Sequence, residues 1–196
     1  MEEQALVAAA RRGDTQAFNK LILNYQTLVY NVAYRVLHNP DAAADAAQEA
    51  FISAFRALGG FRGGSFKAWL LRIVTNACYD QLRSKKRRPS SSLDDLSIDP
   101  DHSPMLIDEA ESPEEHALRQ DLGRVIQSAL DLLPPDQKLT VILSDVQGLS
   151  YEEVAQATGV AVGTVKSRLS RGRARLRDHL ERRQELLPRR YRPIGS

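Results

Sequence analysis

Apolar residues recur at three- and four-residue steps over most of the chain, the spacing that places them on one face of an α-helix. The first long run extends from Phe18 to Val36 and stops before Asn39 and Pro40. Asparagine is a favoured N-cap and proline suits the first helical position, so a second helix is expected from there to about Leu58. The pattern therefore predicts two consecutive amphipathic helices.

The two faces of the helix expected over 40–58 differ in composition. Its apolar stripe, the expected core side, consists of Ala47, Phe51, Ala54, Phe55 and Leu58. The opposite face carries carboxylates, an amide, a cation and one isoleucine: Asp41, Asp45, Gln48, Glu49, Ile52 and Arg56. Such a face is either solvated or docked on another protein, and an isoleucine among carboxylates favours docking.

A third helix is expected from Ser65, its N-cap, to about Ser84, with Phe66, Trp69, Leu70, Ile73 and Ala77 on the core side. The other side combines cations, an amide and an aromatic ring: Arg72, Asn76, Tyr79, Arg83 and Lys86. Cations bind phosphates, and amides and rings can contact unstacked bases. Aromatic residues at helical spacing are more often core, which we expect for Phe66 and Trp69, whereas Tyr79 fits either role.

Helical spacing resumes after residue 112. Ser112 and Glu115 form a capping box for a helix that ends at the double proline 134–135, and a further helix ends near Gly148. Ser150 and Glu153 form a second capping box, which begins a short helix before Gly159. The last helix has an apolar stripe of only Val165, Leu169, Gly172 and Leu176. The rest of its surface is mostly basic or hydroxylated: Thr164, Lys166, Ser167, Arg168, Ser170, Arg171, Arg173, Arg175 and Arg177.

A short helix, a glycine turn and a basic helix together make a helix-turn-helix, whose second helix fits the major groove of DNA. Acidic residues are absent from 163 to 177, and hydroxyls alternate with cations there. This composition favours sequence-specific DNA contact over a merely solvated basic helix.

Charge divides the chain into three parts. Residues 1–88 have 13 Lys and Arg against 7 Asp and Glu, residues 89–118 have 0 against 9, and residues 119–196 have 14 against 9. Basic blocks indicate an anionic partner, nucleic acid first and a membrane surface second. The acidic stretch is expected to be an extended linker, either a solvated tether or a docked strand.

We expect an all-α fold: a helical domain at 1–88, the acidic linker at 89–113, a helix-turn-helix domain at 114–183 and a basic tail at 184–196.

The sequence lacks the signatures of several classes of protein. No apolar run approaches the roughly 18 residues of a membrane helix, and the acidic start lacks a secretory pattern, so we expect a cytoplasmic protein without membrane insertion. The single cysteine, Cys78, and four scattered histidines predict neither disulfide nor metal site, and no cofactor is expected. Cys78 fits a core position better than a thiol switch. No phosphate loop or nucleophile–base pair indicates an enzyme.

Several motifs together resemble the extracytoplasmic-function (ECF) sigma factors of bacterial RNA polymerase. They are DAAADAAQEAF at 41–51, FRG at 61–63, WLLRI at 69–73 with Asn76, GLSYEEVA at 148–155 and VGTVKSR at 162–168. The resemblance covers nearly the whole chain. It implies a non-catalytic initiation subunit of two helical domains, which brings core polymerase to promoters and is controlled by an anti-sigma factor, often one at the membrane.

The resemblance also implies three sets of site residues. Those expected to bind the largest polymerase subunit are Asp41, Asp45, Gln48, Glu49, Ile52 and Phe55. Those expected to capture a flipped base of the minus-ten element, or the backbone beside it, are Phe61, Arg62, Gly63, Ser65, Arg72, Asn76, Tyr79, Arg83, Lys86, Arg87 and Arg88. The minus-thirty-five element is expected to face Lys166, Ser167, Ser170 and Arg171, with Thr164 beside them and Arg168, Arg173 and Arg175 on phosphates.

Two other classes explain only part of the sequence. A stand-alone helix-turn-helix regulator accounts for residues 135–180 but not for the carboxylates of the 40–58 helix. A helical adaptor accounts for interfaces but not for two basic blocks.

Overall fold

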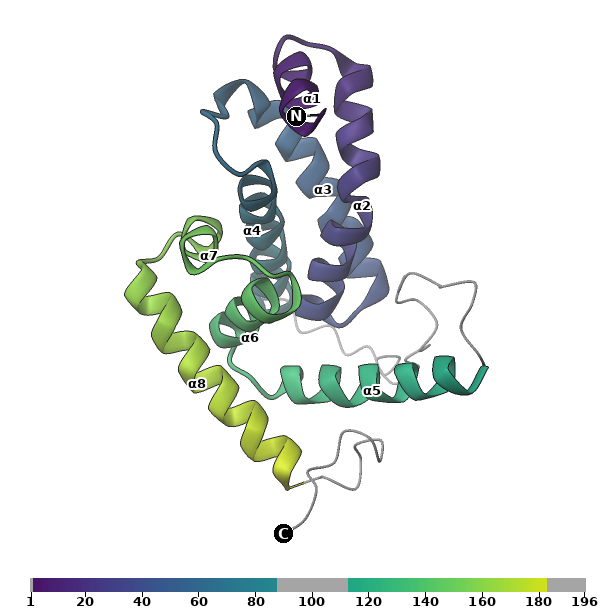
Figure 1. The fold of residues 1–196 in the computed structure, drawn as a ribbon, viewed down its shortest axis with the longest axis vertical. Coiled ribbons are helices and arrows are strands. Elements are labelled where there is room, and N and C mark those ends of the chain that lie inside the picture. The colour runs from purple at the N-terminus through teal and green to yellow at the C-terminus, as the bar shows by residue number, and fades with distance from the viewer. Residues whose placement is uncertain (1, 88–112, 183–196) are drawn as a thin grey trace.

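The computed structural model describes residues 2–87 and 113–182 (Figure 1). Every regular element in these two stretches is helical, which confirms the all-α expectation. We refer to residues 2–87 as the N-terminal unit and to residues 113–182 as the C-terminal unit. The buried residues of both units form one continuous core.

The N-terminal unit contains four α-helices and one 3₁₀ turn: α1 at Glu2–Arg11, α2 at Thr15–Leu37, α3 at Pro40–Ala57, η1 at Leu58–Gly60 and α4 at Phe66–Arg87. Local signals set these boundaries. The Asp14 carboxylate accepts from the backbone of Gln16 and caps α2, and the Asn39 side chain accepts from the N–H of Ala42 and caps α3. The sequence pattern predicted α2, α3 and α4 but not α1.

The C-terminal end of α2 is closed by His38, whose φ of 50° lies in the left-handed region. Its backbone N–H donates to the carbonyl of Tyr34 at 2.7 Å. This left-handed cap turns the chain sharply into α3, so that α2 and α3 pack side by side (Figure 1).

The buried face of α3 is made of small residues: Ala43, Ala46, Ala47, Ala50 and Ala54. Alanines let α3 lie close to its neighbours. Of the expected stripe, Ala47, Ala54 and Leu58 are buried as predicted, and the buried face extends to alanines that the expectation left out. The expectation that Phe55 points inward is wrong, because this residue is 49% exposed. Its ring contacts only the edge of the core, where its centroid lies 5.0 Å from that of the Phe18 ring. Phe51 is half-buried.

Helix α4 packs against α2 and α3 on one side and against α7 of the C-terminal unit on another. Its buried arc is therefore wider than the expected stripe and includes Leu71, Val74 and Cys78, whereas Ile73 and Trp69 are only half-buried. The helix also extends three residues beyond the expected end at Ser84.

The C-terminal unit contains α5 at Pro113–Asp131, α6 at Pro135–Val141, the π-helical turn η3 at Ile142–Val146, α7 at Tyr151–Thr158 and α8 at Val162–Glu181. The Ser150–Glu153 capping box forms as expected, with the Glu153 carboxylate accepting from the N–H of Ser150 at 3.0 Å. Gly159, at φ 69°, provides the left-handed turn between α7 and α8. Ser112 of the other expected capping box lies outside the described residues.

The two units pack against each other. Figure 1 shows α7 beside α4, with α8 on its outer side and α5 crossing the lower end of the molecule. Helix α7 thus contacts both α4 and α8, and it stands between the two helices expected to face DNA.

Candidate protein and nucleic-acid interfaces

The carboxylate face, which we define as Asp41, Asp45, Gln48, Glu49, Ile52 and Phe55, is exposed along α3 at all six positions. Ile52 is 38% and Phe55 49% exposed, so two large apolar side chains lie among anionic groups. The buried alanines on the opposite side of α3 hold the helix in place without using these residues. The face can therefore bind a partner that offers both apolar contacts and positive charge.

The loop before α4 combines an aromatic anchor with glycines. Phe61 is buried, with its ring 5.8 Å from that of Phe66 and 5.2 Å from that of Trp69. Gly63 and Gly64 have φ of 96° and 90°, conformations that L side chains rarely adopt. Arg62 is exposed on this loop. The buried Phe61 thus fixes the loop from beneath and leaves Arg62 and the glycine backbone at the surface.

The expected polar side of α4 is only partly exposed. Arg72, Asn76 and Arg83 are exposed, whereas Tyr79 is half-buried. Burial raises the pKa of Tyr79, Asp136 raises it further and Arg168 opposes the rise, so the phenol lies near charged groups of the C-terminal unit. The side chains of Lys86 and Arg87 and all of Arg88 lie outside what the structure describes.

Helix α8 is attached by the predicted narrow stripe. Val165 and Leu169 are fully buried, and Gly172 allows close approach to α6, because a Cβ there would lie 2.9 Å from a methyl of Val141. The groove-facing residues of α8, which we define as Lys166, Ser167, Ser170 and Arg171, are all exposed. Thr164 is half-buried beside them.

The arginines expected on phosphates differ in their surroundings. Arg168 lies 3.0 Å from a carboxylate oxygen of Asp136, and Arg173 makes two contacts to Asp145, at 3.0 and 2.6 Å. Hydrogen bonding to Asp145 raises the pKa of Arg173. Arg175 is exposed, and within the two described stretches it makes no ion pair. Sequence spacing gave no signal for these acidic partners, because Asp136 and Asp145 belong to other elements.

Other kinds of site receive no support from residues 2–87 and 113–182. No group of three or more potential ligands is placed to hold a metal ion there. Within the same residues, no helix is both long and apolar enough to cross a bilayer. Cys78 is 1% exposed, and burial raises the pKa of its thiol to about 12, so it behaves as a core residue.

Comparison with known protein families finds one match in each of the two units. Sigma-70 region 2 matches residues 21–88, and Sigma-70, region 4 matches residues 123–176. The RNA polymerase sigma-H factor of Pseudomonas aeruginosa is 39% identical over 177 residues, which are 88% of this chain and 90% of that protein. The ECF RNA polymerase sigma-E factor of Escherichia coli K12 is 38% identical over 175 residues, 88% of this chain and 91% of that protein.

A solved structure shares the fold at similar coverage. The sigma factor RpoE of Bartonella quintana, determined with the anti-sigma factor NepR, is 30% identical with a TM-score of 0.64, covering 84% of this chain and 96% of that one. The two regions occur in the same order as the exposed face of α3 and the basic helix α8. The chain therefore belongs to the ECF sigma factors of the sigma-70 family of transcription initiation factors.

Proposed function

We propose that this chain binds core RNA polymerase and directs it to promoters, in the cytoplasm, without catalysing a reaction itself. The observation that carries the proposal is the presence in one chain of an exposed carboxylate face on α3 and a basic groove-facing helix, α8. A stand-alone regulator needs the second surface only. The relatives' names as RNA polymerase factors support the same assignment.

The first test separates these two classes. A sigma factor binds core polymerase in the absence of DNA, which gel filtration of an equimolar mixture reports directly. A stand-alone regulator elutes separately from polymerase and binds duplex DNA alone. Elution of the chain apart from the core enzyme at micromolar concentration would contradict the proposal.

For the minus-ten element, we propose that the exposed parts of the 61–65 loop and α4 form the base-capturing surface. Arg62, Arg72 and Asn76 are available for it. Phe61 acts from beneath, because its buried ring supports the loop and offers no open face for stacking. The loop glycines let backbone N–H groups approach the nucleotide closely, and Ser65 holds the start of α4 by accepting from the N–H of Ala68 at 3.2 Å.

For the minus-thirty-five element, we propose that the groove-facing residues read base edges while Arg175 holds phosphate. Arg171 is directed along its own helix, where its Nη2 donates to the Ser167 hydroxyl at 3.2 Å. The two side chains can therefore contact neighbouring bases together. Arg168 and Arg173 already have carboxylate partners, which reduces their net attraction for phosphate.

The two kinds of contact predict different DNA-binding defects. Lys166→Ala and Arg171→Ala should each reduce the free energy of binding to the preferred DNA sequence by about 1–3 kcal/mol, because they remove hydrogen bonds to bases. Binding to other DNA sequences should change little. Arg175→Ala should weaken binding to all sequences and reduce the salt slope by about one counterion. Fluorescence anisotropy on matched and scrambled duplexes over a salt series measures both. A neutral Arg171→Ala on every duplex tested would rule out the assigned reading face.

Control by an anti-sigma factor belongs to the same proposal. RpoE of B. quintana was solved with its anti-sigma factor NepR, and the 30% identity over 84% of this chain supports a comparable partner here. The carboxylate face is its natural target, since a factor that covers those residues also blocks polymerase.

A further inference from the structure

Helix α1 carries none of the site residues assigned above, but it contacts the elements that hold the 61–65 loop. It packs against α2, and it also contacts η1, the turn that leads directly into Phe61. On the other side of the loop, α4 begins at Phe66. A link from α1 to Phe66 therefore fixes the loop at both of its ends.

Tyr25 of α2 makes this link. Its phenol donates to Oε2 of Glu3 on α1, and its ring centroid lies 5.6 Å from that of Phe66, with the two planes inclined by 59°. Burial raises the pKa of Tyr25, and the hydrogen bond to Glu3 raises it further. The phenol therefore keeps its proton and acts as a donor. One side chain thus connects α1 to the first residue of α4.

Phe66 passes the contact on to the loop through two further rings. Phe66 is 3% and Phe61 5% exposed, and their rings meet edge to face with centroids 5.8 Å apart. The Trp69 ring lies 5.4 Å from that of Phe66 and 5.2 Å from that of Phe61. Tilted and edge-to-face pairs are favoured aromatic geometries. We call Tyr25, Phe61, Phe66 and Trp69 the aromatic support.

The tip of the loop does not hold its own conformation. Gly63 and Gly64 have positive φ, and a Cβ at either position would have no atom within 4 Å. Glycines lose more conformational freedom on ordering than other residues, so a loop that orders only when DNA binds loses affinity and selectivity. The loop therefore depends on the residues that lock its ends in place.

We propose that Glu3 and Tyr25 are positioning residues for the minus-ten loop: their hydrogen bond fixes the aromatic support, and the fixed loop selects the base that it captures. The inference rests on the proposed function for its consequence, but not for the support itself. Both residues act through Phe66 and Phe61. Loss of one hydrogen bond should therefore reduce selectivity about three- to tenfold without abolishing it.

Four variants separate positioning from stability. Tyr25→Phe keeps the ring and removes the donor, Glu3→Ala removes the acceptor, and Glu3→Gln keeps an acceptor oxygen without the charge. Glu2→Ala is the matched control, because Glu2 is also an exposed acidic residue in the first turn of α1. Its loss removes the same favourable charge from the start of the helix. Circular dichroism confirms that each variant is folded.

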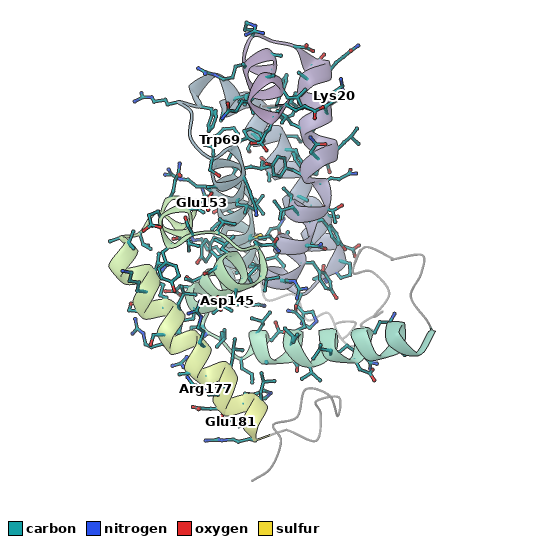
Figure 2. The ribbon with its side chains drawn as sticks, viewed as in Figure 1. Lys20, Trp69, Asp145, Glu153, Arg177 and Glu181 are labelled. Carbon is teal, nitrogen blue, oxygen red and sulfur yellow. The ribbon has the colours of Figure 1, made fainter. Side chains whose placement is uncertain are left out.

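The first measurement uses Trp69, the single tryptophan of the chain, which lies near the start of α4 (Figure 2). Acrylamide quenching of its fluorescence in the free, full-length chain reports how closely the aromatic support is packed. Tyr25→Phe and Glu3→Ala should raise the quenching constant, because loosened rings admit the quencher. Glu3→Gln and Glu2→Ala should stay close to wild type.

The second measurement uses the complex with core polymerase and a pool of short single-stranded DNA with a randomised central segment. Sequencing of the bound fraction gives the enrichment of the preferred sequence. Tyr25→Phe and Glu3→Ala should lower this enrichment about three- to tenfold, while affinity for core polymerase stays unchanged. Glu3→Gln should restore most of the selectivity, and Glu2→Ala should match wild type.

Each outcome decides the proposal. Stronger quenching together with lower enrichment, in Tyr25→Phe and Glu3→Ala only, supports it. Unchanged quenching and enrichment in these two folded variants overturns it, and so do equal losses in Glu3→Ala and Glu2→Ala. Stronger quenching with full enrichment overturns the role in base capture. If the wild-type complex enriches no sequence, the proposed function fails at the minus-ten element, while Trp69 still decides whether α1 supports the loop.

Discussion

Glu49→Lys is expected to weaken binding to core polymerase by about 10- to 100-fold, or about 1.4–2.8 kcal/mol. Glu49 is exposed at the middle of the carboxylate face, and its Oε1 accepts only a local hydrogen bond from Ser53 at 3.2 Å. Reversal of its charge therefore places a cation opposite the positive partner surface while the alanine-packed side of α3 stays intact. Fluorescence titration of labelled chain with core enzyme measures the loss.

The matched control for this variant is Glu181→Lys, which changes the net charge equally at the far end of α8 (Figure 2). It should bind core enzyme like wild type. Thermal unfolding of both variants should stay within about 0.5 kcal/mol of wild type, because exposed positions tolerate exchange. Equal affinities of Glu49→Lys and Glu181→Lys would reject the carboxylate face as the docking surface.

Asn76→Ala is expected to separate promoter opening from recruitment. Asn76 is exposed on α4, so its loss should not disturb the core. Its amide can hydrogen-bond a base edge, and loss of that contact should reduce strand opening about tenfold, since base extrusion costs a few kcal/mol. Binding to core polymerase and to duplex promoter should remain close to wild type.

Permanganate reactivity of unpaired thymines, on duplex and pre-opened bubble templates, measures this effect. The bubble removes much of the unpairing cost and should restore part of the activity of Asn76→Ala. Asn19→Ala, which removes an exposed amide from α2, is the matched control and should open duplex normally. If Asn76→Ala and Asn19→Ala react equally on duplex DNA, Asn76 does not help to capture the flipped base.

Helix boundaries were predictable where their signals are local. Asn39 and Pro40 begin α3, and Ser150 and Glu153 begin α7, because a cap depends on residues within one turn. The narrow apolar stripe of α8 also followed from composition, since so few residues there could be buried.

Features that depend on neighbours in space were not predictable in the same way. Phe55 was placed inward by periodicity, but α3 packs through its small residues, and the Phe55 side chain stays 49% exposed. The wider buried arc of α4 arises from α7, which lies far away in sequence. The contacts from Gln127 and Lys138 to backbone carbonyls at the end of α2 left no signal either, because these two polar residues are typical of a surface in the sequence and only the packing of the two units buries them.

The most direct measurement of the central claim is reconstituted transcription with purified core polymerase, the wild-type chain and a library of genomic fragments, with every RNA 5′ end mapped. A sigma factor should create new starts that share a pair of upstream sequence elements, and these starts should be lost together in the Glu49→Lys variant. Unchanged transcripts with and without the chain, or a general decrease without new starts, would contradict the assignment.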